Sequence, residues 1–339
     1  MVSATRSTPW TVSTIVPTRD RVQWLSDALR SIKAVDERLG SRATIEIVVV
    51  DDGDDPATAA AVRAFGARYL RCVGTGVSAA RNTGLRAATG EFVAFLDDDD
   101  VWSEGQLAAQ LDRFEADPTL GAVFGQCVET DALLRPVGDP CPNAPLPDGD
   151  AVAFFAENVI QIGTLLVRRS AAAATGPFDE SLISSEDWDW TMRLARNARV
   201  AGVPVSVCQV RRHRDPSDLD LDVWWARRRH DDVVIGRAYE QIRPQLSLKD
   251  RLLWGLKAHK ANGSDAALAL TWALSCQERA SAHRAAGWVA AAWHISPLHT
   301  MKLVARHRAL MPAVLGALRG TMTPAPEPVG TLVTARAAD

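Results

Sequence analysis

The chain has 339 residues, with 38 Lys and Arg, 41 Asp and Glu, and an apolar fraction of 47%. This length exceeds the usual single domain of about 100–200 residues, so we expect a main domain with an extension. The charge divides near Asp215: residues 1–215 hold 22 basic against 30 acidic side chains, and residues 216–339 hold 16 against 11. The acidic first part argues against nucleic-acid binding there, whereas the basic second part suits anionic lipid, an acidic partner or water.

Cysteine usage and the start of the chain predict a soluble, unexported protein. The five cysteines are scattered and form no Cys-x-x-Cys pair, which favours neither a disulfide framework nor a thiolate zinc site. The start, "MVSATRSTPW", lacks the apolar segment of a signal peptide, and no run reaches the roughly 18 apolar residues of a membrane span. We therefore expect a protein of the reducing cytoplasm.

Strand and helix patterns alternate through the first part of the chain. Apolar or β-branched runs predict strands at 11–16, 45–50, 68–73 and 91–96. Apolar residues at helical spacing, together with an Asp-Pro start at 55–56, predict helices at 22–32, 56–65 and 78–88. This alternation predicts a doubly wound α/β sheet.

The same domain continues to about residue 215. Ser103 and Gln106 form a capping-box pattern ahead of apolar residues at helical spacing, which predicts a further helix. Pro, Gly and Asp dominate residues 129–150 and indicate a surface loop. A strand at 162–169, a helix at 188–198 and a strand at 203–213 are then expected to complete the domain.

Beyond residue 215 the β-rich character disappears. Candidate helices fall near 221–242, 248–262, 265–281, 283–294 and 298–318, so we expect a mostly helical extension over 216–320 and a disordered tail over 321–339. The stretch "LDVWWARRRHDD" mixes tryptophan with arginine, which suits a packed helix, a membrane surface or an acidic acceptor. The extension is expected to cover the acceptor side of the protein or to support a homo-oligomer, and a peripheral contact with the inner face of the membrane stays open.

Acidic side chains gather where the predicted parallel strands end. The segment Pro17 to Asp20, the pair Asp51 and Asp52, and the run Asp97 to Asp100 each follow a strand. Ligands of open parallel sheets bind at this edge. Four adjacent carboxylates repel one another, and Mg²⁺ or Mn²⁺ bridging to substrate phosphates would offset that repulsion. A solvated acidic turn or a helix N-cap is the alternative.

Two further stretches contain candidate functional residues. In "SSEDWDW", a carboxylate close to tryptophan rings could act as a general base, although a helix N-cap beside two core tryptophans explains the pattern equally well. In "SAARNTG", Arg81 lies on a helix that follows a glycine loop, where it could approach a phosphate. A surface arginine is the simpler explanation of that position.

A competing pattern is "GTGVSA" at 74–79, which matches G-x-G-x-x-A between a strand and a helix. It predicts a dinucleotide site and hence an NAD(P)-dependent oxidoreductase. Against this, the preceding strand carries Arg68 and Arg71 where a central buried strand should be apolar. The pattern also leaves Asp98 to Asp100 without a role.

Taken together, the motifs of residues 11–215 resemble the family 2 glycosyltransferases. These enzymes invert the anomeric configuration and have the GT-A fold, a Rossmann-like nucleotide-diphospho-sugar transferase domain. The segments that carry the resemblance occur in the family's order: "STIVPTRDR", "IEIVVVDDGD", "GVSAARNTGLRAATGEFVAFLDDDDVW", "GPFDESL", "EDWDWTMRLA" and "RRH". The resemblance implies a bacterial enzyme that transfers a sugar from a nucleoside-diphosphate donor to an acceptor. A protein that binds the nucleotide sugar but lacks activity is the alternative.

The resemblance implies roles for the residues at the strand ends. The nucleotide base would lie against Pro17, Arg19 and Asp52, with Arg81 near the base or the diphosphate. The ribose would face two adjacent carboxylates, Asp97 and Asp98. Because Arg19-Asp20 stands where the family often has Tyr-Asn, and Asp54 where Ser is usual, UDP, dTDP and GDP donors all remain open.

The resemblance also implies how the reaction would proceed. Asp99 would bind the Mn²⁺ or Mg²⁺ that holds the diphosphate, and His213 lies where some members place a metal or phosphate ligand. Asp187 matches the catalytic base that deprotonates the acceptor hydroxyl. The acceptor itself cannot be assigned, because acceptor pockets are built from variable loops.

Overall fold

The computed structural model describes residues 8–143, 146, 148–149 and 160–212, and nine further positions between 227 and 244 (227, 230, 231, 233, 234, 236, 237, 240 and 244). The predicted helices after residue 212 fall outside the described residues apart from those nine positions, of which eight are α-helical and 244 is in a 3-10 turn. The predicted tail also falls outside them, and the domain boundaries at 215 and 320 stay predictions.

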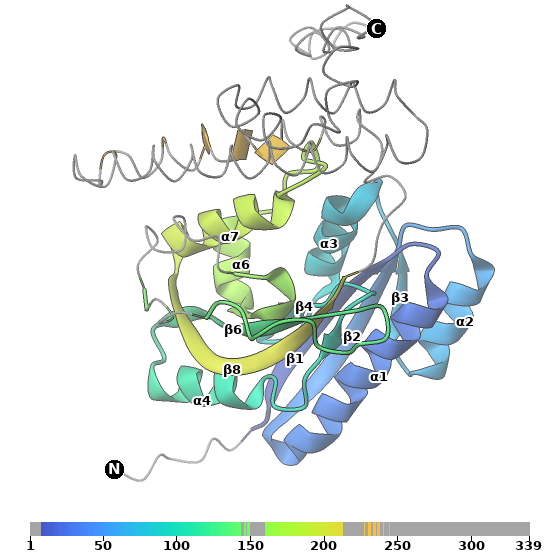
Figure 1. Ribbon diagram of the computed structural model, residues 1–339, viewed down its shortest axis with the longest axis horizontal. Helices are drawn as coiled ribbons and strands as arrows, with labels where there is room; N and C mark the ends of the chain where they lie inside the picture. Colours follow the sequence, from blue (N-terminus) through green and yellow to red (C-terminus); the bar gives the residue numbers. More distant parts are fainter. Residues whose placement is uncertain are drawn as a thin grey trace, which may run out of the picture. The chain divides into compact units, whose positions relative to one another are not determined.

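A single eight-stranded sheet forms the centre of the described part (Figure 1). Its spatial order is β3-β2-β1-β4-β7-β6-β8-β5. In chain order the strands are β1 (Trp10–Thr18), β2 (Ala43–Asp51), β3 (Arg68–Arg71), β4 (Phe92–Phe95), β5 (Val101–Trp102), β6 (Leu120–Thr130), β7 (Leu165–Arg168) and β8 (Arg199–Arg211). The helices are α1 (Val22–Leu39), α2 (Pro56–Ala64), α3 (Gly76–Ala87), α4 (Ala108–Ala116), α6 (Arg169–Thr175) and α7 (Glu186–Asn197), with 3-10 turns at Gly40–Arg42 and Ile162–Thr164.

The first four strands of the chain are parallel, as the strand–helix alternation predicts. β1 pairs with β2 and with β4, and β2 pairs with β3, all in parallel. The second half of the sheet is mixed, because β7 runs antiparallel to both β4 and β6, while β8 is parallel to β6. The predicted α/β fold is confirmed, with an antiparallel strand inside a sheet that the pattern alone predicted to be doubly wound.

Helices cover both faces of this sheet. One apolar cluster packs α1 and α4 against it through side chains such as Leu29 and Phe114, and a second packs α6 and α7 through Ala172, Trp190 and Leu194. Figure 1 shows α1 and α4 on one side of the sheet and α3, α6 and α7 on the other. A fully buried side chain of this kind stabilises the fold by about 1.5–3 kcal/mol, so the two layers hold the strand ends in place.

One predicted helix start is wrong. The Ser103 and Gln106 pattern predicts a helix from residue 104, but α4 begins at Ala108 after a run of turns. The amide of Gln106 donates to the carbonyl of Ser103, and Leu107 turns to φ 55°. The side chain of Gln110 then accepts a hydrogen bond from the Leu107 amide and donates to the carbonyls of Val123 in β6 and Thr164 in the 3-10 turn, so tertiary contacts override the local capping pattern.

Candidate active site

The loops that follow β1, β2 and β4 meet at the carboxyl ends of these strands, as expected for parallel strands. Asp20 links two of them, because its Oδ1 accepts from the amides of Asp54 (2.8 Å) and Asp55 (2.9 Å). Gly53 permits this approach, since a Cβ there would lie 2.4 Å from that same Asp20 oxygen. Asp20, where the family often has Asn, therefore joins the β1 loop to the β2 loop in this chain.

Two arginines neutralise three carboxylates of the Asp97 to Asp100 run. Arg81 pairs with Asp97 at 2.8 Å, while Arg21 pairs with Asp98 at 2.7 Å and with Asp99 at 2.9 Å. From the sequence, we expect a bound cation to offset the repulsion among these carboxylates. The protein itself supplies positive charge, and Arg21 was not among the residues that the motifs singled out.

Two further interactions of the run fix it to the sheet. Asp98 is fully buried and accepts a 2.6 Å hydrogen bond from the Thr18 hydroxyl, and burial raises its pKa to about 7 against the opposing effect of Arg21. Asp100 is also buried, which raises its pKa well above the ordinary value, and it accepts from the Arg211 amide at 2.8 Å. Asp98 and Asp100 thus point into the protein.

Asp97 and Asp99 are the members of the run that stay partly open. Their side chains are 29% and 17% exposed, against 1% for Asp98. An approaching diphosphate or cation would therefore meet these two carboxylates first. Asp98 lies beneath these two carboxylates, and its contact with a ribose stays a prediction.

Arg81 connects this rim to the start of α7. It is 2% exposed, and its second guanidinium nitrogen lies 2.7 Å from Glu186. Its charge also acts on the Asp187 carboxylate. Arg81 is therefore a buried bridge between Asp97 and Glu186, and the Glu186 contact was not predicted. Its place near the nucleotide base or the diphosphate stays a prediction.

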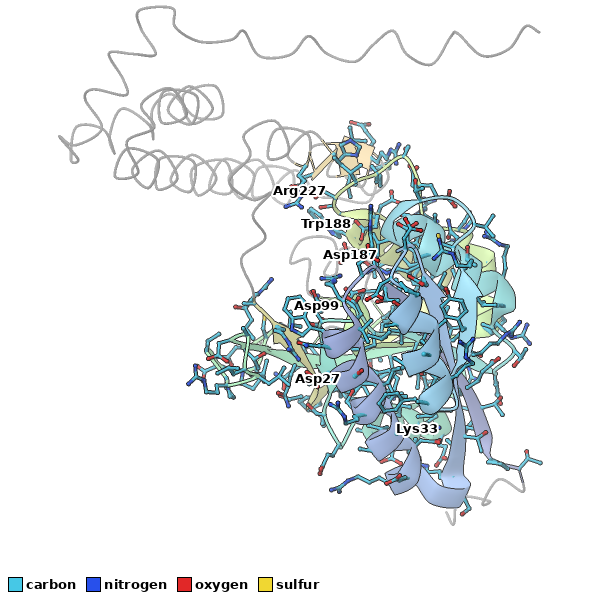
Figure 2. The ribbon with its side chains drawn as sticks, turned by 90° about the vertical axis from the view of Figure 1, so that its right-hand side faces the viewer. Asp27, Lys33, Asp99, Asp187, Trp188 and Arg227 are labelled. Carbon is cyan, nitrogen blue, oxygen red and sulfur yellow. The ribbon has the colours of Figure 1, made fainter. Side chains whose placement is uncertain are left out.

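Asp187 lies in the first turn of α7, directly after Glu186. Burial, strengthened by the Glu186 charge, raises the pKa of Asp187 to about 6, while Arg81 opposes the shift. Its Oδ1 accepts from the Trp188 amide at 2.7 Å. Figure 2 shows Asp187 and Asp99 toward one end of the domain, whereas Lys33 of α1 lies toward the other. A carboxylate with this pKa can take up a proton near neutral pH.

Asn82, next to Arg81, locks the segment that leads into α7. Its side-chain amide donates to the Phe178 carbonyl (3.0 Å) and to Glu180 (2.8 Å), and its oxygen accepts from the Phe178 amide (2.8 Å). The Phe178 ring stacks on Trp190 at 4.8 Å, and Trp190 is fully buried. The motifs "SAARNTG" and "GPFDESL" thus meet through one asparagine, a contact that their separation in sequence conceals.

The structure argues against a dinucleotide site at "GTGVSA". The preceding strand β3 lies at the edge of the sheet and carries exposed arginines at both ends, rather than occupying the centre. The Gly76 amide, at the start of α3, donates to Asp52 at 2.8 Å. The glycine loop therefore closes onto the β2 loop, and that amide is already used.

The remaining predicted site residues divide into two groups. Pro17 lies in β1 opposite Val50, and Arg19 follows as an exposed side chain 4.0 Å from Asp52. Both stand beside the β2 loop, in agreement with a shared location. His213 lies outside the described residues, so its predicted role is not tested.

The residues at the rim fit a divalent cation that arrives with a diphosphate. Among the residues described, no three or more His, Cys, Asp or Glu side chains are grouped as a ready-made metal site. Such a group is unnecessary, because Mg²⁺ commonly takes one or two carboxylates and completes its shell with phosphate oxygens and water. Asp97 and Asp99 are carboxylates of that kind.

The mixed sheet with an acid-rich edge is the architecture of a GT-A domain, and solved structures share it. TarS residues 1–349 from S. aureus, in complex with UDP-GlcNAc, has a TM-score of 0.52 at 18% identity, over 88% of this chain and 92% of that one. The mannosyltransferase PcManGT from Pyrobaculum calidifontis, in complex with GDP-Man and Mn²⁺, has a TM-score of 0.52 at 20% identity, over 92% and 88%. At these identities the likeness shows the fold alone.

Residues 13–137 match the family described as glycosyl transferase family 2. The succinoglycan biosynthesis protein ExoM of Rhizobium meliloti is 32% identical over 167 residues, which make up 45% of this chain and 50% of that protein. The chain spans half or less of this and other curated relatives that it matches. The predicted family and fold are thereby confirmed. The family match includes Asp97 to Asp99 and ends before Asp187.

Within the described residues, no helix has both the length and the apolar character needed to cross the membrane.

Proposed function

We propose that this protein transfers a sugar from a nucleoside-diphosphate donor to an acceptor hydroxyl, with inversion at the anomeric carbon and with Mn²⁺ or Mg²⁺. The observation that carries the proposal is the chain of charges Asp97–Arg81–Glu186, which ends beside Asp187. It couples a rim suited to a diphosphate to a carboxylate suited to a general base. The family match supports the class of reaction.

The donor is assigned to the edge where the β1, β2 and β4 loops meet. In this proposal Pro17, Arg19 and Asp52 contact the base, Asp97 and Asp98 lie toward the ribose, and Asp99 holds the cation. UDP, dTDP and GDP donors fit the proposal. UDP-GlcNAc in the TarS complex and GDP-Man in the PcManGT complex support this range of nucleotides, and Mn²⁺ in the latter supports the metal.

The reaction requires a base on one side of the sugar and a leaving group on the other. Asp187 takes the proton from the acceptor hydroxyl as its oxygen attacks the anomeric carbon, and the bond from that carbon to the diphosphate breaks. The cation, when bound, stabilises the charge that develops on the departing diphosphate. Attack from the side opposite the leaving group inverts the anomeric configuration. His213 is proposed as a further ligand of the metal or phosphate.

The cellular setting is proposed from the same features. The described cysteines Cys72, Cys127, Cys141 and Cys208 are free thiols. We assign the protein to the cytoplasm. In this proposal the region after residue 215 contacts the inner face of the membrane or a second copy of the chain. The acceptor is a polysaccharide, a lipid-linked sugar or a small molecule.

Replacing the base by its isostere tests the proposal. In Asp187→Asn, sugar transfer to any competent acceptor, or donor hydrolysis, should fall by about 10²–10⁴-fold, while affinity for the nucleoside diphosphate changes little. Asp112→Asn is the control, since Asp112, on α4, forms an exposed ion pair with Arg42. Turnover retained in Asp187→Asn would remove its assigned role, and donor binding without any turnover of the unmodified protein would indicate an inactive binding protein.

A further inference from the structure

A helical segment from beyond residue 215 contacts the chain immediately before Asp187. Three consecutive residues bond to one turn of this segment: the Ile183 amide donates to His230 Nδ1 (3.2 Å), and the hydroxyls of Ser184 and Ser185 both donate to Asp231 Oδ1 (2.7 Å each). His230 and Asp231 belong to the same compact unit as the α/β domain. One carboxylate thus gathers two adjacent side chains at the entrance of α7.

The backbone at this point is in a conformation that needs support. Ser185, the N-cap of α7, has φ 56° and ψ 21°, the left-handed region that a residue with a Cβ rarely adopts. Its side chain makes no capping bond to the helix, because the hydroxyl points to Asp231. Such a backbone persists only when the surroundings determine it. Glu186 and Asp187 follow directly, so the direction of α7 at its first turn depends on Ser185.

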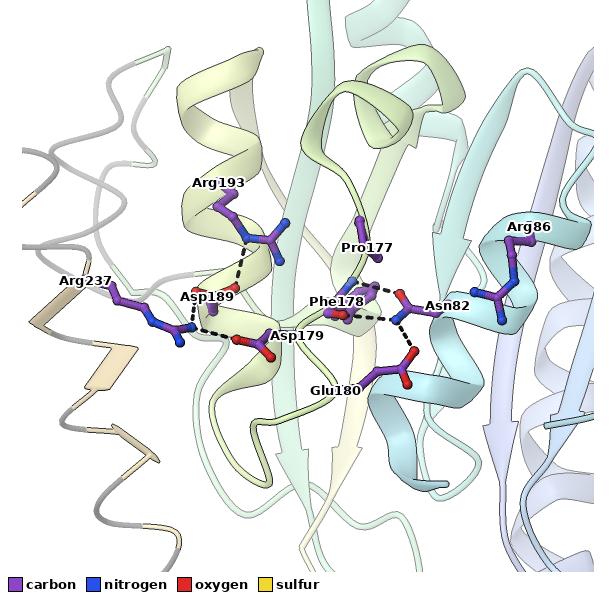
Figure 3. A pocket seen from close by; sticks show the side chains of 9 residues that line it. All are labelled: Asn82, Arg86, Pro177, Phe178, Asp179, Glu180, Asp189, Arg193 and Arg237. Atoms are coloured by element: carbon purple, nitrogen blue, oxygen red, sulfur yellow. Dashed lines mark hydrogen bonds and ion pairs between the residues drawn. The ribbon is translucent and has the colours of Figure 1, made fainter. Parts of the chain in front are cut away.

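A second contact of the same segment holds the neighbouring loop and the far side of α7. Arg237 lies 2.8 Å from Asp179 and 3.7 Å from Asp189, and Asp189 also pairs with Arg193 (Figure 3). Burial alone would raise the pKa of Asp179, but hydrogen bonds from Ser181 and Arg237 lower it to about 2.

These groups line a cavity of about 720 Å³ between α3, the loop at 177–180 and α7. Asp189 is about 200° around the helix from Asp187, so this cavity lies on the opposite side of α7 from the base.

We propose that His230, Asp231 and Arg237 form a clamp that positions Asp187 for proton transfer. The clamp holds the chain at Asp179, at Ile183 to Ser185 and at Asp189, on both sides of the base in sequence. It makes the segment after residue 215 part of the catalytic apparatus, although none of its three residues is expected to touch the substrate. This inference rests on the proposed role of Asp187.

The test compares Asp231→Ala with the unmodified full chain in two measurements. The first is hydrogen–deuterium exchange of the 183–187 amides, which requires no turnover. The second is steady-state transfer, where we expect kcat to fall about 10–100-fold with the donor KM nearly unchanged, because a displacement near 1 Å can cost about a hundredfold in rate. Asp117→Ala is the matched control, since Asp117 also accepts a hydrogen bond from a side-chain hydroxyl, that of Thr119, in a turn before β6.

A rescue variant separates positioning from loss of packing. Ser185→Gly in the Asp231→Ala background should recover part of kcat, because glycine adopts a positive φ without the cost that serine incurs. Ser184→Ala with Ser185→Ala should reproduce the Asp231→Ala effect if the hydroxyls are the point of attachment. Faster exchange at 183–187 with reduced kcat supports the clamp.

Unchanged exchange in Asp231→Ala overturns the proposal, and so does faster exchange with kcat within twofold of the unmodified protein. If the unmodified protein transfers no sugar, the proposed function fails. The exchange result alone then decides whether the clamp orders this segment.

Discussion

A single substitution at Arg81 tests most severely whether buried ion pairs hold the candidate site together. Arg81→Met keeps much of the side-chain volume and removes the charge that pairs with Asp97 and Glu186. Removing one partner of a buried ion pair costs about 3–5 kcal/mol, since the other charge is left unpaired. The side chains of Arg81 and Glu186 are 3% and 12% exposed, but Asp97 is 29% exposed and partly screened by water. We therefore expect a loss of about 3 kcal/mol in unfolding free energy.

The assay is equilibrium urea unfolding of the full chain, followed by far-ultraviolet circular dichroism and by tryptophan fluorescence. Urea m-values of small proteins are about 1–3 kcal/mol per molar. With an m-value near the upper end of this range, the midpoint of urea unfolding should fall by about 1 M. Arg30→Met is the matched control, because Arg30 pairs with Asp27 at 2.6 Å with the two side chains 63% and 34% exposed. An exposed pair of this kind contributes at most about 1 kcal/mol.

A double variant shows whether the loss arises from the unpaired carboxylates. Glu186→Gln in the Arg81→Met background should recover part of the midpoint, since one buried charge then disappears. If Arg81→Met shifts the midpoint no more than Arg30→Met does, the bridge between Asp97 and Glu186 does not hold the site together.

Three further predictions concern neighbouring groups. Asn82→Ala leaves the buried amide and carbonyl of Phe178 without partners, so we expect a loss of about 2–5 kcal/mol in unfolding free energy by urea titration, and a loss below about 1 kcal/mol would contradict the locking role. The pKa of about 6 for Asp187 predicts that kcat/KM falls tenfold per pH unit below pH 6, because the base must be unprotonated to act. Since the Arg81 charge lowers this pKa, Arg81→Met should move the acid limb to higher pH. A flat profile from pH 5 to 8 would exclude Asp187 as the base.

The parallel half of the sheet could be predicted from local patterns. The β-branched run at 45–50 lies within β2, and the Asp55-Pro56 pair starts α2, with the Asp55 side chain accepting from the Ala57 amide. These features depend on residues close in sequence, where burial periodicity and capping chemistry determine the outcome. The same dependence explains the failure at Ser103, where contacts with distant strands set the start of α4 instead.

The carboxylates of the candidate site could be located from the sequence, but their partners could not. Arg21 is 78 residues from Asp99, and Asn82 is 96 residues from Phe178. No local spacing encodes such pairs, since only the packed sheet brings them together. Asp231, 46 residues after Ser185, likewise lies in a basic, tryptophan-rich stretch that a packed helix, a membrane surface or an acidic acceptor could each explain.

The central claim is that the acid-rich edge binds a nucleoside diphosphate together with a cation. The most direct measurement is calorimetric titration of the full chain with UDP, dTDP, GDP and NAD, each with Mn²⁺ and again with a chelator, in the unmodified protein and in Asp99→Asn. The account predicts that one nucleoside diphosphate binds with Mn²⁺, and that both the chelator and Asp99→Asn weaken it sharply. Binding of NAD irrespective of metal, or nucleotide binding that neither change affects, would contradict it.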